Sequence, residues 1–241
     1  MGKKLEKCLN FLFPVNLTCN LCGREIFSGE HFCEECESNL PKNNDVICNH
    51  CGRKVLNAEE YCNSCKGRET YFEKARSVFD YKEPIKGLIY QLKYNGKRYL
   101  AQIFASRMAM LYISNYYNCD FALAVPMSEQ RLKVRKYNQA QLLAESLCEK
   151  VGIPHESDLL LKVVETARQT GLSASVRRQN LKGTFKIADK SRVKGKRILL
   201  VDDVMTTGAT VECISELLIK NGAKEVLVLT VASVNHDGEH F

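Results

Sequence analysis

The sequence ILLVDDVMTTGAT, from Ile198 to Thr210, joins a run of apolar residues to two adjacent carboxylates and then to a turn of small and hydroxylated residues. An unbroken apolar run is typical of a strand that is covered on both faces. Apolar residues at helical spacing continue after Thr210. We therefore expect a strand, a turn and a helix, with Asp202 and Asp203 where the strand ends.

The turn from Met205 to Thr210 has the composition of a phosphate-binding loop. At the start of a helix, free backbone N–H groups and the helix dipole attract an anion. Gly208 lets the backbone approach a ligand closely, and three threonines add hydroxyl donors. Two carboxylates would repel a phosphate, so we expect Asp202 and Asp203 to face the hydroxyl groups of the sugar that carries it. The stretch predicts a receptor for a sugar phosphate.

Other phosphate-binding loops fit the stretch less well. A Walker A loop is excluded because there is no GKS or GKT, and a dinucleotide fingerprint lacks its glycines. A plain strand, turn and helix in a flavodoxin-like fold stays open, because acidic residues at strand ends also serve receiver domains and magnesium sites.

The chain around this stretch alternates strands with helices. Two segments have the apolar spacing of amphipathic helices, RYLAQIFASRMAMLYIS from Arg98 and NQAQLLAESLCEKVG from Asn138. Four short apolar runs predict buried strands: FALAVP from Phe121, LLLKVV from Leu159, RILLVDD from Arg197 and EVLVLTVASV from Glu225. The alternation predicts a parallel α/β sheet, in which ligands bind beyond the carboxyl ends of the strands.

The amino-terminal part contains a duplicated cysteine pattern. CNLCGREIFSGEHFCEEC begins at Cys19, and in CNHCGRKVLNAEEYCNSC each cysteine recurs 29 positions later. Two CxxC turns supply the four thiolates of a closed structural zinc site. We expect two structural zinc ions, the first held by Cys19, Cys22, Cys33 and Cys36 and the second by Cys48, Cys51, Cys62 and Cys65. This sequential pairing closes shorter loops than a cross-braced one, and an iron–sulfur cluster stays open as an alternative.

Length and charge limit the remaining possibilities. The 241 residues fit one large core with a small appendage, which we place at residues 71–241 and 1–70. A formal net charge of +7 favours polyanionic partners such as phosphates or nucleic acid. Asparagine and proline interrupt the short apolar run near the amino terminus, and we expect a cytoplasmic protein without membrane insertion.

The stretch from Ile198 to Thr210 resembles the signature of the type I phosphoribosyltransferases, which bind 5-phosphoribosyl-1-pyrophosphate (PRPP). The whole chain resembles the ComF/ComFC competence family, because the motifs occur in the family's order: LNFLFPVNLTCNLCG, the cysteine repeat, LKYNGKRYLA, AVPMSEQRLKVRKYNQAQLLA, RQTGLSASVRRQNLKGTF and the signature. The resemblance implies a type I phosphoribosyltransferase-like α/β domain with a parallel sheet and an amino-terminal double zinc ribbon. It also implies a role in natural transformation, with single-stranded DNA and other competence proteins as partners.

The resemblance assigns roles to individual residues. Asp202 and Asp203 would hold the ribose hydroxyls and are the predicted catalytic residues, and Mg²⁺ would accompany the pyrophosphate of PRPP. The predicted ligand-binding residues of the turn are Met205, Thr206, Thr207, Gly208, Ala209 and Thr210. The candidate cations for the pyrophosphate are Lys93, Arg131, Arg135, Arg168 and Arg177.

Two further functions stay open. A metabolic phosphoribosyltransferase would transfer ribose 5-phosphate to a nucleobase or an amine, whereas a zinc-stapled scaffold would carry only a vestigial pocket. The hypoxanthine-guanine enzymes have an aspartate where this chain has Thr206, so the resemblance implies binding of PRPP and leaves the transfer step open. Basic segments near the signature, with Tyr94, Tyr99 and Tyr137, suggest binding of single strands without sequence-specific readout.

Overall fold

The computed structural model describes residues 18–26, 30–43, 46–55, 61–67, 70–115, 117–164, 181 and 183–235. The chain divides into two compact units, Met1–Pro41 and Lys42–Phe241. The first unit contains the first cysteine group and a short helix, α2 (Glu34–Ser38). The second cysteine group shares its unit with the α/β domain. The domain boundary near residue 70 stays a prediction.

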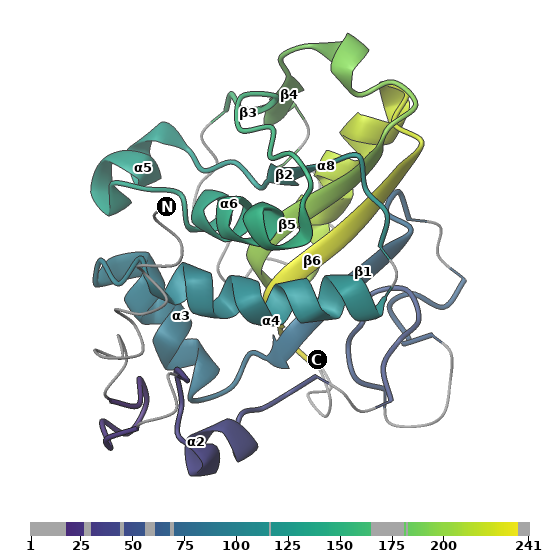
Figure 1. Ribbon diagram of the computed structural model, residues 1–241. Helices are drawn as coiled ribbons and strands as arrows, with labels where there is room; N and C mark the ends of the chain where they lie inside the picture. Colours follow the sequence, from purple (N-terminus) through teal and green to yellow (C-terminus); the bar gives the residue numbers. More distant parts are fainter. Residues whose placement is uncertain are drawn as a thin grey trace. The chain divides into compact units, whose positions relative to one another are not determined.

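The main sheet of the larger unit has four parallel strands in the order β1-β6-β5-β2, as Figure 1 shows. The strands are β1 (Lys74–Asp80), β2 (Phe121–Ala124), β5 (Arg197–Met205) and β6 (Glu225–Ser233). In β6 every residue after the first is buried, because helices cover both faces of the sheet. The parallel sheet predicted from the sequence is confirmed.

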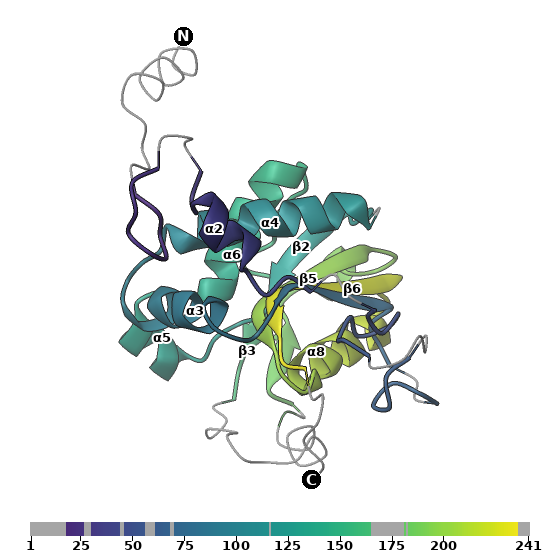
Figure 2. The same cartoon turned by 90° about the horizontal axis from the view of Figure 1, so that it is seen from below.

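Helices lie on both sides of this sheet. In Figure 2, α4 (Leu100–Ser114) and α6 (Gln139–Val151) lie on one side and α8 (Ala209–Lys220) lies on the other. The two segments with helical spacing do form α4 and α6. Two shorter helices, α3 (Ile85–Tyr94) and α5 (Glu129–Arg135), lie near the carboxyl ends of the strands. A 3₁₀ turn, η1 (Lys190–Arg192), precedes β5. No helix in the described ranges has the length and apolar character needed to cross a bilayer.

One predicted strand has a different place in the fold. Of the run LLLKVV, only β3 (Leu160–Lys162) is a strand, and it pairs antiparallel with β4 (Phe185–Ile187) in a separate two-stranded sheet. The expectation of a strand covered on both faces is wrong here, because Leu161, Val163 and Val164 are exposed. This two-stranded sheet, which we call the β3–β4 hairpin, forms one side of the cleft described below.

Candidate functional site

Each cysteine group is arranged for one metal ion. Among the described residues, Cys19, Cys22, Cys33 and Cys36 form one group and Cys48, Cys51, Cys62 and Cys65 form the other, as sequential pairing predicts. Within each group the Sγ atoms lie within 4.8 Å of one another. The amides of Gly23 and Gly52 donate at 3.0 Å to the carbonyls of Cys19 and Cys48, which closes the same tight turn in both copies. Four converging thiols without an open position fit structural zinc.

The acidic pair lies inside β5, which continues four residues beyond the apolar run that ends at Val201. Asp202 and Asp203 both line a cleft, but Asp203 is buried whereas Asp202 is partly exposed. The Asp203 amide donates to Asp202 Oδ1 at 2.8 Å. The two carboxylates therefore differ in environment, although the same role was predicted for both.

Asp203 is held by two side chains from other elements. Lys93, at the end of α3, forms an ion pair with Asp203 Oδ2, and Gln139 Nε2 donates to Asp203 Oδ1 at 3.4 Å. Burial alone would raise the pKa of Asp203, but the Lys93 ammonium lowers it below the ordinary value. Asp203 in turn raises the pKa of Lys93 against the effect of burial. Lys93, predicted as a pyrophosphate cation, is thus already paired in this structure.

Asp202 has the opposite tendency. Burial, together with the neighbouring charge of Asp203, raises the pKa of Asp202 well above its ordinary value. A carboxylate in this position is stabilised when a cation or a hydroxyl donor approaches from the cleft. Asp202 is therefore the member of the pair that is available to a ligand.

The signature turn connects β5 to α8. Gly208 has φ +81° and directly precedes α8, which begins at Ala209. A residue with a Cβ would be strained in this left-handed conformation. Thr206 is exposed and Thr210 lines the cleft, whereas Met205 and Ala209 are buried and offer a ligand only their backbone.

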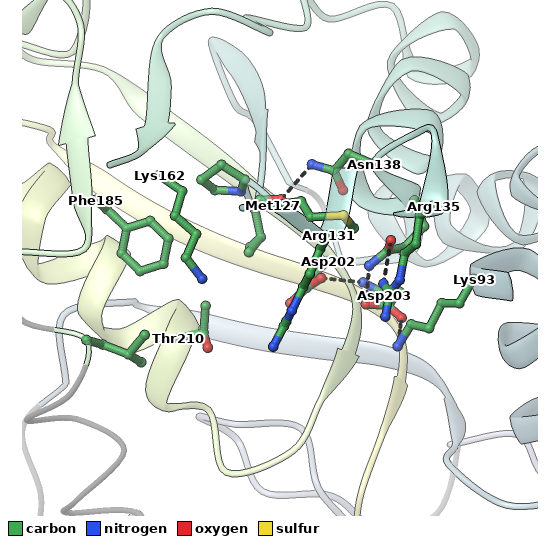
Figure 3. Close-up of a pocket in the computed structure, with 14 residues that line it drawn as sticks. Lys93, Met127, Arg131, Arg135, Asn138, Lys162, Phe185, Asp202, Asp203 and Thr210 are labelled. Atoms are coloured by element: carbon green, nitrogen blue, oxygen red, sulfur yellow. Dashed lines mark hydrogen bonds and ion pairs between the residues drawn. The ribbon is translucent and has the colours of Figure 1, made fainter. Parts of the chain in front are cut away.

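The cleft above the carboxyl end of β5 has a volume of about 220 Å³. Figure 3 shows the side chains of Arg131 and Lys162 extending toward Asp202 and Thr210. The cleft is lined by Lys93, Val125, Pro126, Met127, Arg131, Arg135, Asn138, Gln139, Lys162, Leu181, Phe185, Asp202, Asp203 and Thr210. Four basic side chains thus surround two carboxylates, and one of these carboxylates is already paired with Lys93.

The predicted arginines have different environments. Arg131 is exposed and lines the cleft. Arg135 also lines it, but its guanidinium donates to Gln139 Oε1 at 3.1 Å and to the Tyr94 hydroxyl at 2.7 Å. Arg168 and Arg177 lie outside the described residues. Arg131 is therefore the predicted cation that is best placed for a ligand phosphate.

Lys162 and Phe185 are among the cleft residues that the sequence did not predict. Lys162 and Phe185 are paired across the β3–β4 hairpin, with Lys162 Nζ 6.0 Å from the centre of the Phe185 ring. The signal for Lys162 is that it is the one charged residue in the run LLLKVV. Phe185 gave no such signal, because its place depends on a strand pairing that the sequence pattern did not reveal.

Two domain families match the chain. A double zinc ribbon domain matches residues 8–66, and a phosphoribosyl transferase domain matches residues 139–240. Together with the parallel sheet and the site on β5, these matches define a type I phosphoribosyltransferase-like domain that follows a double zinc ribbon.

Relatives of the whole chain identify the family. "DNA utilization protein YhgH" of Escherichia coli O157:H7 is 31% identical over 216 residues, covering 87% of each chain. "Competence protein F" of Haemophilus influenzae is 34% identical over 172 residues, which cover 68% of this chain and 75% of the relative. "Competence protein ComFC" of Streptococcus pneumoniae is 31% identical over 152 residues, covering 63% of this chain and 64% of the relative. The chain belongs to the ComF family.

Proposed function

We propose that the cleft binds PRPP, or a related ribose phosphate, together with Mg²⁺. The observation that carries this proposal is the position of Asp202, a partly exposed carboxylate that lines the same cleft as Thr210 in the first turn of α8. The ribose hydroxyls would donate to Asp202, and the 5-phosphate would accept from the amides and hydroxyls of the turn from Thr206 to Thr210.

The basic side chains and Mg²⁺ account for the rest of the ligand. Arg131 and Lys162 supply positive charge on the side of the cleft that faces the turn. Mg²⁺ prefers carboxylate and phosphate oxygens, and Asp202 is the carboxylate that would hold it beside the pyrophosphate. The ion would neutralise negative charge on the pyrophosphate. Its positive charge would also favour the ionised form of Asp202, whose pKa is raised in the unliganded protein.

A thermal melt tests this proposal. A ligand that binds only the folded protein at about 100 times its Kd adds about 2.7 kcal/mol of stability. For a domain of this size, we expect PRPP with Mg²⁺ to raise the Tm by about 5–10 °C. Ribose with Mg²⁺ serves as the control, because it lacks the phosphates. The absence of a shift at millimolar PRPP would contradict binding.

The site favours binding over a defined group transfer. Among the described residues that line the cleft, Asp202 and Asp203 are the only acids, and there is no histidine. Thr206 occupies the position at which the hypoxanthine-guanine enzymes have an aspartate that assists the nucleobase. A metabolic phosphoribosyltransferase remains the second candidate, and release of pyrophosphate from PRPP with a panel of nucleobases and amines would distinguish it from a binding protein.

A surface beside the cleft is suited to single-stranded DNA. Tyr90 and Tyr94 on α3 are 57% and 54% exposed, and their ring centroids are 4.8 Å apart. The guanidinium of Arg135 lies over the Tyr94 ring at 4.6 Å. Exposed Arg131 and Lys133 lie on the same short helix as Arg135. We call these five residues the α3–α5 surface.

The α3–α5 surface combines two features of proteins that bind single strands. Aromatic rings stack on bases without selecting a sequence, and basic residues follow the phosphate backbone. Helix α3 contains Lys86 and Lys93 and no acidic residue. One of the three relatives named above is called a DNA utilization protein, and the other two are called competence proteins. Single-stranded DNA and other competence proteins are therefore the proposed partners, and DNA uptake in natural competence is the proposed role.

The paired tyrosines should contribute measurably to DNA affinity. Base stacking on an aromatic side chain contributes about 1–3 kcal/mol per base. We expect Tyr90→Ala/Tyr94→Ala to weaken binding of a fluorescent oligothymidine at least about tenfold, measured by anisotropy. The wild-type affinity should also fall steeply as salt is added, because bound cations are released from the phosphates.

Tyr99 provides a matched control for this variant. It is 48% exposed, and it directly precedes α4 rather than lying on α3. Tyr99→Ala should bind the oligonucleotide like the wild type, which departs from the stacking role that the sequence suggested for Tyr99. If the double variant also binds like the wild type, the strand does not lie on the α3–α5 surface.

A further inference from the structure

The two copies of Cys-Gly-Arg place their arginines in different environments. In the first ribbon, Arg24 forms an ion pair with Glu35 at 2.8 Å, and both side chains are more than half exposed. In the second ribbon, Arg53 is only 7% exposed, and its Nη2 donates to the carbonyl of Thr206 at 2.6 Å. The duplicated position therefore joins the second cysteine group directly to the signature turn.

The cysteine turn that carries Arg53 is fixed against the main sheet. The Ala75 amide on β1 donates to the His50 carbonyl at 2.8 Å, and Arg76 Nη1 donates to the Cys48 carbonyl at 3.4 Å. A Cβ on Gly52 would lie 2.5 Å from the Ala75 carbonyl oxygen, so the turn packs on β1 without a side chain between them. The turn and β1 thus form one rigid support for Arg53.

The cysteine turn itself depends on the metal group. The Cys48 amide donates to the Arg53 carbonyl at 2.8 Å, and Cys51 lies only two residues before Arg53. A metal ion holds such a turn together, because four thiolates converge on it, whereas thiols without the ion have no comparable bond. Occupation of the second group therefore favours one position of the Arg53 backbone.

At the other end of the contact, Arg53 orients the signature turn. A trans peptide is planar, so the Thr206 carbonyl and the Thr207 amide point in opposite directions. By holding the carbonyl, Arg53 fixes the direction in which that amide can donate. The guanidinium also approaches Gly208, since a Cβ there would lie 3.7 Å from Arg53 Nη2. Its positive charge beside the turn favours a bound anion.

We propose that Arg53 is a positioning residue through which the metal in the second cysteine group preorganises the signature turn for the ribose phosphate. This inference rests on the proposed binding of PRPP and adds a dependence on one of the two metal groups. Arg53 does not need to touch the ligand. It transmits the order of the cysteine turn to the backbone that receives the 5-phosphate.

Calorimetric titration of the zinc-loaded full chain with PRPP and Mg²⁺ tests whether Arg53 positions the signature turn for the ligand. Loss of one charge-assisted hydrogen bond should make Arg53→Ala bind about tenfold more weakly, with its zinc content unchanged. Arg53→Lys keeps the charge and a donor and should recover part of the affinity. Arg24→Ala removes the exposed copy and should bind like the wild type. Equal affinity of the wild type and Arg53→Ala would overturn the proposal.

The coupling between the metal and the signature turn can be tested on the wild-type chain, so the main measurement does not depend on whether a variant folds. Coupling between two sites is reciprocal, so PRPP with Mg²⁺ should tighten the binding of one zinc ion against a competing chelator. Arg53→Ala should lose this effect and Arg24→Ala should keep it. An unchanged zinc affinity in a wild type that binds PRPP would overturn the coupling alone. A wild type that does not bind PRPP would instead overturn the proposed function.

Discussion

Replacing Cys51 with serine is expected to destabilise the whole α/β unit. Cys48 and Cys51 are buried in the same hydrophobic core as Phe72 and Ala75, which joins the second metal group to β1. Binding of a structural zinc ion supplies on the order of 10 kcal/mol to small zinc domains. If only about 4 kcal/mol of this is lost, the Tm of the unit should fall by roughly 10 °C. Calorimetry measures the change, and metal analysis should show a fall from two zinc ions to one.

The first ribbon provides the matched control. Cys22 is exposed and belongs to the compact unit that ends at Pro41. Cys22→Ser should likewise reduce the zinc content from two ions to one, but it should leave the main calorimetric transition in place. If Cys51→Ser melts like Cys22→Ser, the second metal group does not stabilise the α/β core.

The sequence predicts the elements whose apolar residues have a clear period. The signature forms the predicted strand, turn and helix, since Ile198, Leu199, Leu200 and Val201 are fully buried and α8 follows Gly208. The two amphipathic segments form α4 and α6. The cysteine repeat groups as predicted because CxxC spacing brings thiols together locally. In each case the residues whose pattern predicts the element lie within one short segment of the chain.

Other elements depend on contacts between distant segments. The β1 sequence KARSVFD has no apolar run. Its Arg76 is nevertheless buried, since it donates to the carbonyls of the second cysteine turn. Helix α5 has no buried residue and therefore no apolar stripe to detect. The Lys93–Asp203 and Arg53–Thr206 contacts join residues more than 100 positions apart. A pattern within one segment cannot reveal such pairs.

Replacing Asp202 and replacing Asp203 with asparagine are expected to have different effects on the stability of the unliganded protein. Asp203→Asn leaves the Lys93 ammonium without its partner in a site where both side chains are largely buried, and breaking such a pair costs about 3–5 kcal/mol. Asp202→Asn removes a carboxyl whose pKa folding raises, so the unliganded protein should keep or gain stability. The same variant should lose the Tm increase from PRPP and Mg²⁺, with affinity reduced by about 100-fold or more.

The pH dependence separates the two roles. A carboxyl with a raised folded pKa contributes stability at low pH that is lost as the pH rises toward that pKa. At about pH 8 the unliganded Asp202→Asn protein should therefore melt above the wild type, and the difference should shrink as the pH is lowered. Calorimetry without ligand measures it. If Asp202→Asn destabilises the protein as Asp203→Asn does, Asp202 is a structural carboxylate, and the ribose hydroxyls must be bound elsewhere.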